Sequence, residues 1–372
     1  MRILIYALGA RVGGGVTYVQ NILPALSRVN RQHTFAIALS SRYQRSLIDT
    51  VPYDMELVEV DLPAQPLVRR WWYQQTKLVR LLQEMEIDLL FAPGESSYLR
   101  VPTRFVMLAG NLSIYAPPCA FGSRRWRMLM YRLTRQLLVF FTLQKADRVV
   151  FVSAAFRDRV IDRMRLNPAK ARLVHHGVSA IFLHRTSRPN PFLNGAPYFL
   201  SVSTINPHKN YETLLRAYSE LPAAAPNLVI AGKPLDEPTY RLLQSIVAQE
   251  ELGDRVHLLG EVAYDKLPAL YQGAIAFIFP SRLESFGLPL VEAMASGVPV
   301  IASDLPVCHE ICQDAAFYFP PQDVRALAII MQRLQQDAGL RNSLAQRGQT
   351  RARAFSWDES ARKLIDVFEE LA

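Results

Sequence analysis

Short apolar runs, many of them rich in Val and Ile, alternate with helix-like segments along almost the whole sequence. Many runs are apolar at nearly every position, whereas the segments between them, such as residues 211–221 and 239–252, repeat apolar residues with helical spacing. Strands that are apolar on both faces are typical of parallel sheets covered by helices on each side. The sequence therefore predicts an α/β fold. The expected strands are residues 2–8, 34–40, 55–61, 88–94, 104–110, 148–153, 171–178, 198–204, 227–232, 255–261, 274–281, 298–304 and 315–321.

About a dozen strands exceed what one doubly wound sheet comfortably holds, so we expect two Rossmann-like domains. The polar, proline-rich stretch 183–197 is the predicted linker between residues 1–182 and residues 198–355. The closing segment, residues 356–372, is expected to be a helix that can cross back onto the first domain. Ligands of such sheets bind at the carboxyl ends of the strands, so the site is expected in a cleft between the domains.

Positive charge is concentrated in the first half of the chain. Residues 1–185 contain 26 Lys and Arg against 12 Asp and Glu, a balance of +14. Residues 186–372 contain 16 against 21, a balance of −5. This asymmetry indicates that the first half meets an anionic partner, such as a nucleic acid, an anionic membrane or a phosphorylated substrate.

The composition favours a cytoplasmic location. The cysteines, Cys119, Cys308 and Cys312, are too few for a disulfide framework, and the last two lack the spacing and partners of a zinc site. Residues 1–15 contain no small-residue cleavage site, so they are interpreted as a first strand and a glycine turn rather than a signal peptide. No apolar stretch reaches the roughly 20 residues of a membrane span.

Glycines 13–15 follow the first expected strand and open a helix-like segment. Glycine lets backbone N–H groups approach a ligand closely, and a helix N-terminus favours negative charge. The stretch matches neither G-x-G-x-x-G nor a Walker loop, so a tight turn without ligand and a diphosphate or sugar contact both stay open. Lys209 has the corresponding place in the second half, where it would either meet phosphate oxygens or simply be solvated.

Two glutamates, Glu284 and Glu292, flank the sequence FGLP at residues 286–289. Pro289 suits the first position of a helix, so the amides before it would lie at a helix N-terminus. Glu292 would then lie near the first turn, where the helix dipole stabilises a carboxylate with or without a ligand. Glu284 lies in the loop after an apolar strand, where a carboxylate can accept hydrogen bonds from sugar hydroxyls.

The stretch ESFGLPLVEAMASGVPVIAS, residues 284–303, resembles the E-x7-E signature of the retaining family-4 (group 1) glycosyltransferases of the GT-B fold, of the bacterial polysaccharide and lipopolysaccharide type. STINPHKN at 203–210 is similar to the family's G-[RT]-x3-K loop, and CHEICQDAAFYFPPQD at 308–323 to its PEvxgdAAxxfdPxd run. The glycine turn and VHHGV at 174–178 also fit, so the resemblance spans nearly the whole chain. It implies two Rossmann-like domains that face each other across a cleft.

The resemblance also implies roles for single residues. Glu292 would hold the ribose of a nucleotide sugar, Glu284 would contact hydroxyls of the transferred sugar, and Val262 would meet the nucleobase through its backbone. The residues implied in donor binding are Gly14, Gly15, Thr204, Lys209, Val262, Phe286, Gly287, Leu288 and Glu292. Those implied in catalysis are Glu284, Lys209 and Asn111. A lysine and helix N-terminal dipoles can stabilise a leaving diphosphate, and the sequence has no Asp-x-Asp motif. No metal and no cofactor besides the donor substrate are therefore expected.

Two departures from the family pattern concern the site. Many relatives have an arginine where Thr204 stands, and relatives with Thr there often have arginine directly before the lysine, where this chain has His208. The family's His-Asp-Leu after a first-domain strand is replaced by residues 110–112, Gly-Asn-Leu. Asn111 would then substitute for the histidine near the reacting sugar.

Residues 67–83 and 121–148 combine arginines, tryptophans and apolar residues at helical spacing. Basic amphipathic helices of this kind can lie on an anionic membrane. They can equally be helices that pack aromatic residues in the core and keep their arginines solvated. The first interpretation predicts an enzyme that is peripheral at the inner face of the cytoplasmic membrane.

Taken together, the sequence predicts a glycosyltransferase that moves a hexose, such as mannose, rhamnose or glucose, from a nucleotide sugar to a glycan or lipid-linked acceptor in cell-surface polysaccharide or O-antigen synthesis. A GT-B enzyme that processes sugar nucleotides, such as an epimerase, is one alternative. A basic nucleic-acid-binding protein is another, but the acidic second half and the lack of a recognisable nucleic-acid module disfavour it, and no nucleic acid is expected as a partner. Both glycine turns miss the dinucleotide fingerprint of an oxidoreductase.

Overall fold

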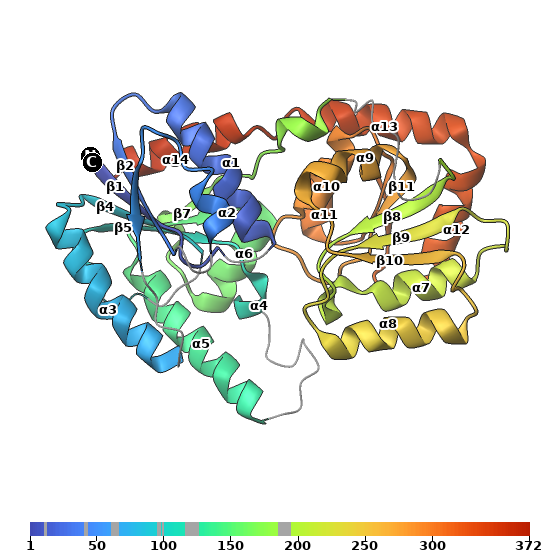
Figure 1. Cartoon of the computed structure of the whole chain (residues 1–372), viewed down its shortest axis with the longest axis horizontal. Helices are drawn as coiled ribbons and strands as arrows, with labels where there is room; N and C mark the ends of the chain where they lie inside the picture. The colour runs from blue at the N-terminus through green and yellow to red at the C-terminus, as the bar shows by residue number, and fades with distance from the viewer. Residues whose placement is uncertain are drawn as a thin grey trace. The chain divides into compact units, whose positions relative to one another are not determined.

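The computed structural model describes residues 1–10, 13–40, 44–60, 67–94, 98, 100–115, 126–184 and 195–372, with only the backbone at residues 45, 46, 67–74, 113 and 126–129. The chain folds into two units, shown in Figure 1. Unit 1 comprises Met1–Gly177 and Ser356–Ala372, and unit 2 comprises Val178–Phe355.

The boundary falls at Gly177 rather than at residue 182, because the 3₁₀ helix η3 (Ala180–Phe182) packs into unit 2. The Phe182 ring lies 5.4 Å from that of Tyr264 and 5.7 Å from that of Tyr271. The described ends of the predicted linker, residues 183–184 and 195–197, belong to unit 2, and residues 185–194 lie outside the described residues.

Unit 1 is built on a seven-stranded parallel sheet in the order β3-β2-β1-β4-β5-β6-β7. Its strands are β1 (Arg2–Tyr6), β2 (Thr34–Leu39), β3 (Glu56–Glu59), β4 (Leu89–Pro93), β5 (Arg104–Ala109), β6 (Arg148–Phe151) and β7 (Ala171–Leu173). Its helices are α1 (Gly14–Val29), α2 (Arg45–Ile48), α3 (Leu67–Glu84), α4 (Leu112–Tyr115), α5 (Trp126–Lys145), α6 (Ala154–Met164), η2 (Pro168–Lys170) and α14 (Trp357–Glu369). The apolar run 171–178 yields a shorter strand than expected, since β7 ends at Leu173.

The closing helix α14 fills a face of this sheet that the other helices leave open. Right-handed crossovers put α3, α5 and α6 on one face of the sheet and α1 on the other, and Figure 1 shows α1 and α14 together, opposite α3 and α5. On the face of the sheet that carries α1, strands β4–β7 therefore have to be covered by another helix. The ring of Phe368 on α14 lies 5.4 Å from that of Phe91 on β4, and Asp358 accepts a hydrogen bond of 2.6 Å from Arg28 on α1.

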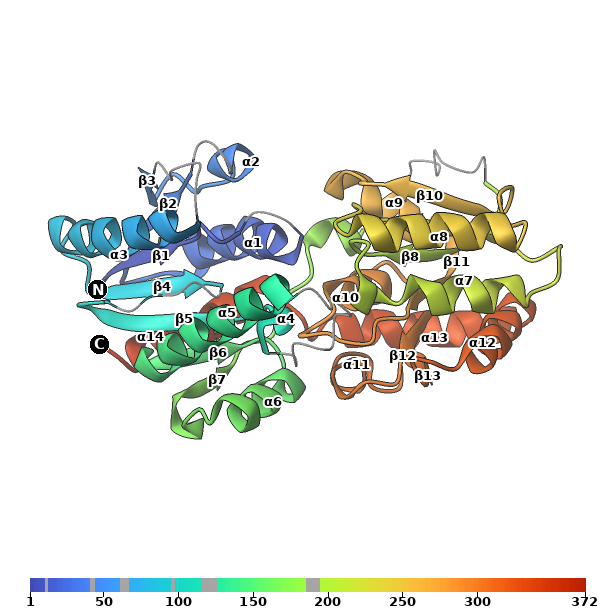
Figure 2. The same cartoon turned by 90° about the horizontal axis from the view of Figure 1, so that it is seen from below.

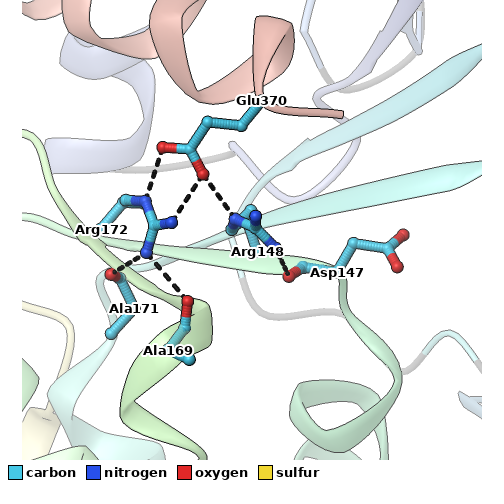
Figure 3. Close-up of polar contacts among 6 residues, drawn as sticks. All are labelled: Asp147, Arg148, Ala169, Ala171, Arg172 and Glu370. Atoms are coloured by element: carbon cyan, nitrogen blue, oxygen red, sulfur yellow. Dashed lines mark hydrogen bonds and ion pairs between the residues drawn. The ribbon is translucent and has the colours of Figure 1, made fainter. Parts of the chain in front are cut away.

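Glu370, directly after α14, ties the end of the chain to β6 and β7. Figure 3 shows two guanidinium groups converging on its carboxylate. Arg172 donates from Nε at 2.7 Å and from Nη2 at 2.6 Å, and Arg148 donates from Nε at 2.7 Å. These hydrogen bonds, chiefly those from Arg172, lower the pKa of Glu370 to about 2.

Unit 2 is built on a six-stranded parallel sheet in the order β10-β9-β8-β11-β12-β13. Its strands are β8 (Tyr198–Val202), β9 (Asn227–Ala231), β10 (Val256–Gly260), β11 (Ala274–Phe279), β12 (Val300–Ser303) and β13 (Ala316–Phe319). Its helices are η3, η4 (Pro207–Lys209), α7 (Tyr211–Ser219), α8 (Glu237–Gln249), η5 (Tyr264–Lys266), α9 (Leu267–Gln272), α10 (Leu288–Ala295), α11 (Pro306–Cys312), α12 (Val324–Gln336) and α13 (Ala338–Ala352).

Helices α7 and α8 cover one face of the second sheet, as seen from below in Figure 2, and α12 lies beside α7 against β11 and β13. Fully buried residues of this layer include Phe199 on β8, Leu214 on α7 and Met331 on α12. The prediction of an α/β protein with two Rossmann-like parallel sheets is confirmed.

Candidate functional site

The sheet of unit 2 reverses its strand order between β8 and β11. From β8 the chain continues through α7 to β9 and β10 on one side, whereas β11 leads through α10 to β12 and β13 on the other. The loops that leave the carboxyl ends of β8 and β11 therefore part in opposite directions. Open α/β sheets bind their ligands at such a switch point, and Lys209 and Glu284 lie in the segments that follow these two strands.

A buried asparagine holds these segments together. Asn210 follows η4 in a left-handed conformation, with φ 59°, and is 3% exposed. Its Nδ2 donates to the carbonyl of Pro280 at 2.9 Å and to that of Pro321 at 2.7 Å, while Thr213 donates from Oγ1 to its Oδ1 at 2.9 Å. One side chain thus connects the segments after β8, β11 and β13.

Lys209 and Glu284 form an ion pair at the switch point. The distance from Lys209 Nζ to Glu284 Oε1 is 2.6 Å, and the two side chains are only 13% and 11% exposed. The ammonium also lies 5.7 Å from the centre of the Phe279 ring. Because both charges are largely removed from water, their attraction is weakly screened. The two residues that the sequence assigned to phosphate and sugar contacts lie side by side.

His208 does not replace the missing arginine as a cation. Burial lowers the pKa of its imidazole to about 4, and the neighbouring Lys209 ammonium acts in the same direction. The ring is therefore neutral near pH 7. Thr204 accepts a hydrogen bond of 3.0 Å at Oγ1 from Asn206, within the same segment.

The helix α10 begins next to this ion pair. Gly287 is its N-cap with φ +93°, and a Cβ there would lie 2.9 Å from Leu290 Cδ1. Leu288 is the first helical residue, so Pro289 occupies the second position rather than the first. Phe286 anchors the turn, since its buried ring packs 5.8 Å from that of Phe355. The N-terminus of α10 carries the partial positive charge that an anion would meet.

Glu292 lies one turn inside α10 and is 5% exposed. Its Oε2 accepts a hydrogen bond of 3.1 Å from the hydroxyl of Tyr271. The hydroxyl of Tyr264 also acts on the carboxylate, whose pKa it lowers. Burial raises the pKa of Glu292 to about 7, although the two hydroxyls oppose the shift. The sequence pattern around Glu292 could not predict these tyrosines, because they lie on η5 and α9, outside the helix that carries Glu292.

The carboxyl ends of β8, β9 and β10 meet at one edge of the sheet. A Cβ on Gly232, after β9, would lie 1.7 Å from the carbonyl oxygen of Ser203, so the backbones approach as only glycine permits. The amide of Gly232 donates to the carbonyl of Gly260 at 2.7 Å. Val262, the predicted nucleobase contact, follows β10 and is half-buried.

The remaining predicted residues belong to unit 1. Gly14 and Gly15 are exposed in the first turn of α1, whose N-cap Gly13 has φ 58°. The turn before them is held by buried Gln44, which donates to the carbonyls of Ala7 and Ala10. Asn111 is exposed directly before α4. Whether these residues share one site with Lys209 stays a prediction.

Within the described ranges, no three His, Cys, Asp or Glu side chains are grouped so that they could hold a metal ion. Over the same part of the chain, none of the helices combines the length and the apolar character needed to span a bilayer. Cys308 and Cys312 are buried free thiols of α11, and Cys119 lies outside the described residues.

Two family models match the sequence, one for each half. Glycosyltransferase Family 4 matches residues 12–180, and Glycosyl transferases group 1 matches residues 185–351. Among curated proteins, the O-antigen chain mannosyltransferase RfbU of Salmonella typhimurium is 30% identical over 203 residues, which are 54% of each chain. The O-antigen chain mannosyltransferase B of Escherichia coli is 36% identical over 183 residues, 47% of this chain and 46% of that protein. The chain spans about half the length of the curated relatives it matches.

Solved structures of similar fold cover the whole chain. Sucrose-phosphate synthase of Thermosynechococcus elongatus gives a TM-score of 0.81 at 20% identity and covers 100% of this chain and 99% of that one. Anabaena HepE, solved in complex with UDP-glucose, gives 0.80 at 19% identity and covers both chains completely. At this level of identity the similarity establishes the two-domain fold.

Proposed function

Since the chain belongs to the family-4 (group 1) glycosyltransferases, we propose that it transfers a hexose from a nucleoside-diphosphate sugar to a glycan or lipid-linked acceptor. The observation that carries the proposal is the Lys209–Glu284 ion pair at the switch point, beside the N-terminus of α10. Glycosyl transfer develops negative charge on the leaving diphosphate and positive charge on the sugar. A cation, a helix N-terminus and a carboxylate in one place suit both charges.

In the proposed site, Lys209 and the amides of Gly287 and Leu288 hold the diphosphate, and Glu284 accepts hydrogen bonds from hydroxyls of the transferred sugar. Glu292 accepts from the ribose. Retention of the anomeric configuration follows from family membership. The charge-stabilising groups belong to the chain itself, so no metal is proposed.

The names of the relatives support a finer proposal for the substrates. Two of them are O-antigen chain mannosyltransferases, which favours mannose as the hexose and O-antigen synthesis as the process. HepE was solved with UDP-glucose, so the base of the donor needs a direct test. Neither the epimerase nor the nucleic-acid-binding alternative is supported by these relatives.

The test of the proposed site compares Glu284→Gln with Glu212→Gln. Glu212 is a matched control because it also pairs with a cation, Arg216, but on the exposed face of α7. Thermal shifts with UDP, GDP, ADP and dTDP first identify the base. Release of that nucleotide from its mannose, glucose and rhamnose conjugates is then measured with a lipid extract as acceptor.

We expect Glu284→Gln to lower the release rate by about a hundredfold or more and to keep the nucleotide-induced thermal shift. Glu212→Gln should behave as the wild type. Near-normal turnover by Glu284→Gln would refute the assignment of this carboxylate, and the lack of any nucleotide response in the wild type would refute the function.

Peripheral contact with an anionic membrane is the second part of the proposal, and α5 supports it. Four apolar side chains, Met130, Leu133, Leu137 and Phe141, recur with helical spacing and are 51%, 43%, 55% and 46% exposed. They form one outward stripe of the helix, on the unit that carries the positive balance. The tryptophans of residues 67–83 and the arginines at 124, 125 and 127 lie outside the described side chains.

Flotation with vesicles of phosphatidylglycerol and phosphatidylethanolamine tests the stripe. The double variant Leu137→Gln, Phe141→Gln should lose the vesicle-bound fraction, because it removes buried apolar area from the contact. Leu242→Gln is the control, since Leu242 is 43% exposed on α8 of unit 2. Unchanged flotation of the α5 variant would exclude this stripe as the membrane contact.

A further inference from the structure

The buried carboxylate of Glu292 interacts with the hydroxyls of two tyrosines. Tyr271 is fully buried on α9, and its hydroxyl donates to Glu292 Oε2 at 3.1 Å. The Tyr264 hydroxyl on η5 also lowers the pKa of the carboxylate. Besides burial, these two hydroxyls are the groups that act on the pKa of Glu292. An ionised, buried carboxylate without a cation beside it is costly to fold around.

Both phenol rings are fixed by aromatic packing. The ring of buried Phe182 meets that of Tyr264 edge-on at 5.4 Å and that of Tyr271 at 5.7 Å. The Tyr271 ring also lies 5.3 Å from that of Phe277 on β11. The hydroxyls are therefore presented to the carboxylate by rigid side chains with few alternative rotamers.

Other buried tyrosines of unit 2 serve the backbone instead. Tyr198 donates to the carbonyl of Leu270, and Tyr218 donates to that of Pro226 at 2.9 Å. Such bonds satisfy a hydroxyl within the fold. The two tyrosines near Glu292 act on a carboxylate instead. They fix the orientation of a group that can still accept further hydrogen bonds.

A carboxylate has about four lone-pair positions, two on each oxygen. The Tyr271 hydroxyl occupies one of them and the Tyr264 hydroxyl also interacts with the carboxylate, which leaves two acceptor positions for a ligand. The vicinal hydroxyls of a ribose are two donors on adjacent carbons. The number of remaining acceptor positions thus matches the number of ribose donors.

We propose that Tyr264 and Tyr271 are positioning residues that orient the Glu292 carboxylate to accept hydrogen bonds from both ribose hydroxyls of the nucleotide. This inference rests on the proposed function, because it assigns the tyrosines to the donor site of the glycosyltransferase. Tyr264 comes two residues after Val262, the proposed contact of the nucleobase. One short segment would therefore serve both the base and the ribose.

The arrangement makes ribose recognition depend on pH. The pKa of Glu292 is raised to about 7 by burial and is kept from rising further by the two hydroxyls. The carboxylate form, which offers both remaining acceptors, predominates above that pKa. Removal of either hydroxyl raises the pKa further, so the variant should need a higher pH for the same preference.

The experiment measures affinity by calorimetry for the nucleoside diphosphate that gives the largest thermal shift and for its 2′,3′-dideoxy analogue. The preference is the ratio of the two dissociation constants. Titration of the ligand's phosphates cancels in this ratio. The proteins are the wild type, Tyr264→Phe, Tyr271→Phe, Glu292→Gln and Tyr218→Phe, each measured between about pH 6 and about pH 9.

We expect the wild-type preference for the ribonucleotide to rise with pH around pH 7. Tyr271→Phe and Tyr264→Phe should each reduce the preference at neutral pH by about tenfold and move its rise to higher pH. Glu292→Gln should remove the pH dependence. Tyr218→Phe, whose hydroxyl contacts Pro226 and Arg255 rather than Glu292, should keep the wild-type ratio.

The possible failures are distinguishable. Tyrosine variants that weaken both ligands equally would show that the hydroxyls only support the fold, which would overturn the inference alone. Variants with the wild-type ratio and pH midpoint would overturn it as well. A wild type that binds no nucleotide would overturn the proposed function and this inference with it.

Discussion

Replacement of Asn210 tests whether one side chain holds the segments of the candidate site together. Its amide and carbonyl groups make three hydrogen bonds in a buried place, and each contributes about 1 kcal/mol. Asn210→Gly loses these bonds but tolerates φ 59°, so we expect a loss of about 3 kcal/mol. Asn210→Ala adds a side chain that disfavours this left-handed conformation, which costs about 1 kcal/mol more.

The assay is differential scanning calorimetry of the full chain, in which a destabilised unit 2 lowers one transition. For a unit of this size, about 3 kcal/mol corresponds to a decrease in Tm of about 6 to 12 °C. Thr213→Val is the matched control, because it removes only the bond between Thr213 and Asn210 Oδ1. It should lower Tm by about a third of that amount.

The same variants should also weaken nucleotide binding, because Lys209 directly precedes Asn210 and Pro280 leads into the loop of Glu284. A loosened connection lets the two members of the ion pair move apart. The reasoning is wrong if Asn210→Gly unfolds within about 2 °C of the wild type. It is also wrong if Asn210→Gly and Asn210→Ala are equally stable, since the left-handed conformation would then carry no cost.

Two further predictions concern other places in the fold. Glu370→Gln should be less stable than the wild type near neutral pH, by under about 1 kcal/mol because the ion pair is partly solvated. In the wild type the pKa of Glu370, about 2, lies below its value in the unfolded chain, so the difference in urea midpoints between variant and wild type should shrink as the pH falls from about 5 towards 2. A difference that does not change with pH would contradict this prediction. Gly177→Ala should lower the Tm of unit 1 in calorimetry, because its Cβ would lie 2.2 Å from the backbone nitrogen of Trp357. An unchanged Tm would show that the backbone at Gly177 is not tightly packed against the start of α14.

Much of the fold was predictable because each strand can be recognised from its own residues. Strands such as β4 and β11 are apolar at nearly every position, which indicates burial on both faces without knowledge of their neighbours. The loops that follow β8 and β11 could be assigned to a site for the same reason, since parallel strands bring their carboxyl ends to one edge. Lys209 and Glu284 were therefore expected at the same edge, and they form an ion pair there.

The partners of the site residues were not predictable, because they depend on packing between distant segments. Tyr271 precedes Glu292 by 21 residues and reaches it from another helix, and Asn210 reaches Pro321 across 111 residues. Neither contact leaves a spacing pattern in the sequence. The pattern at residues 284–292 suggested a carboxylate in the first turn of a helix, whereas its actual surroundings are two phenols in the interior.

Thr204 stands where many relatives have an arginine, and the structure shows how this affects the positive charge between β8 and α7. His208 could have replaced its charge, but burial and Lys209 lower the pKa of the imidazole to about 4, so it is neutral at pH 7. The positive charge of the β8–α7 segment is then that of Lys209, and Glu284 balances it at 2.6 Å. An anion that binds here meets the paired Lys209 ammonium and the N-terminus of α10, and exposed Arg282 lies in the same loop as Glu284. Attraction of a diphosphate to this edge would then depend on the N-terminus of α10 as well as on Lys209.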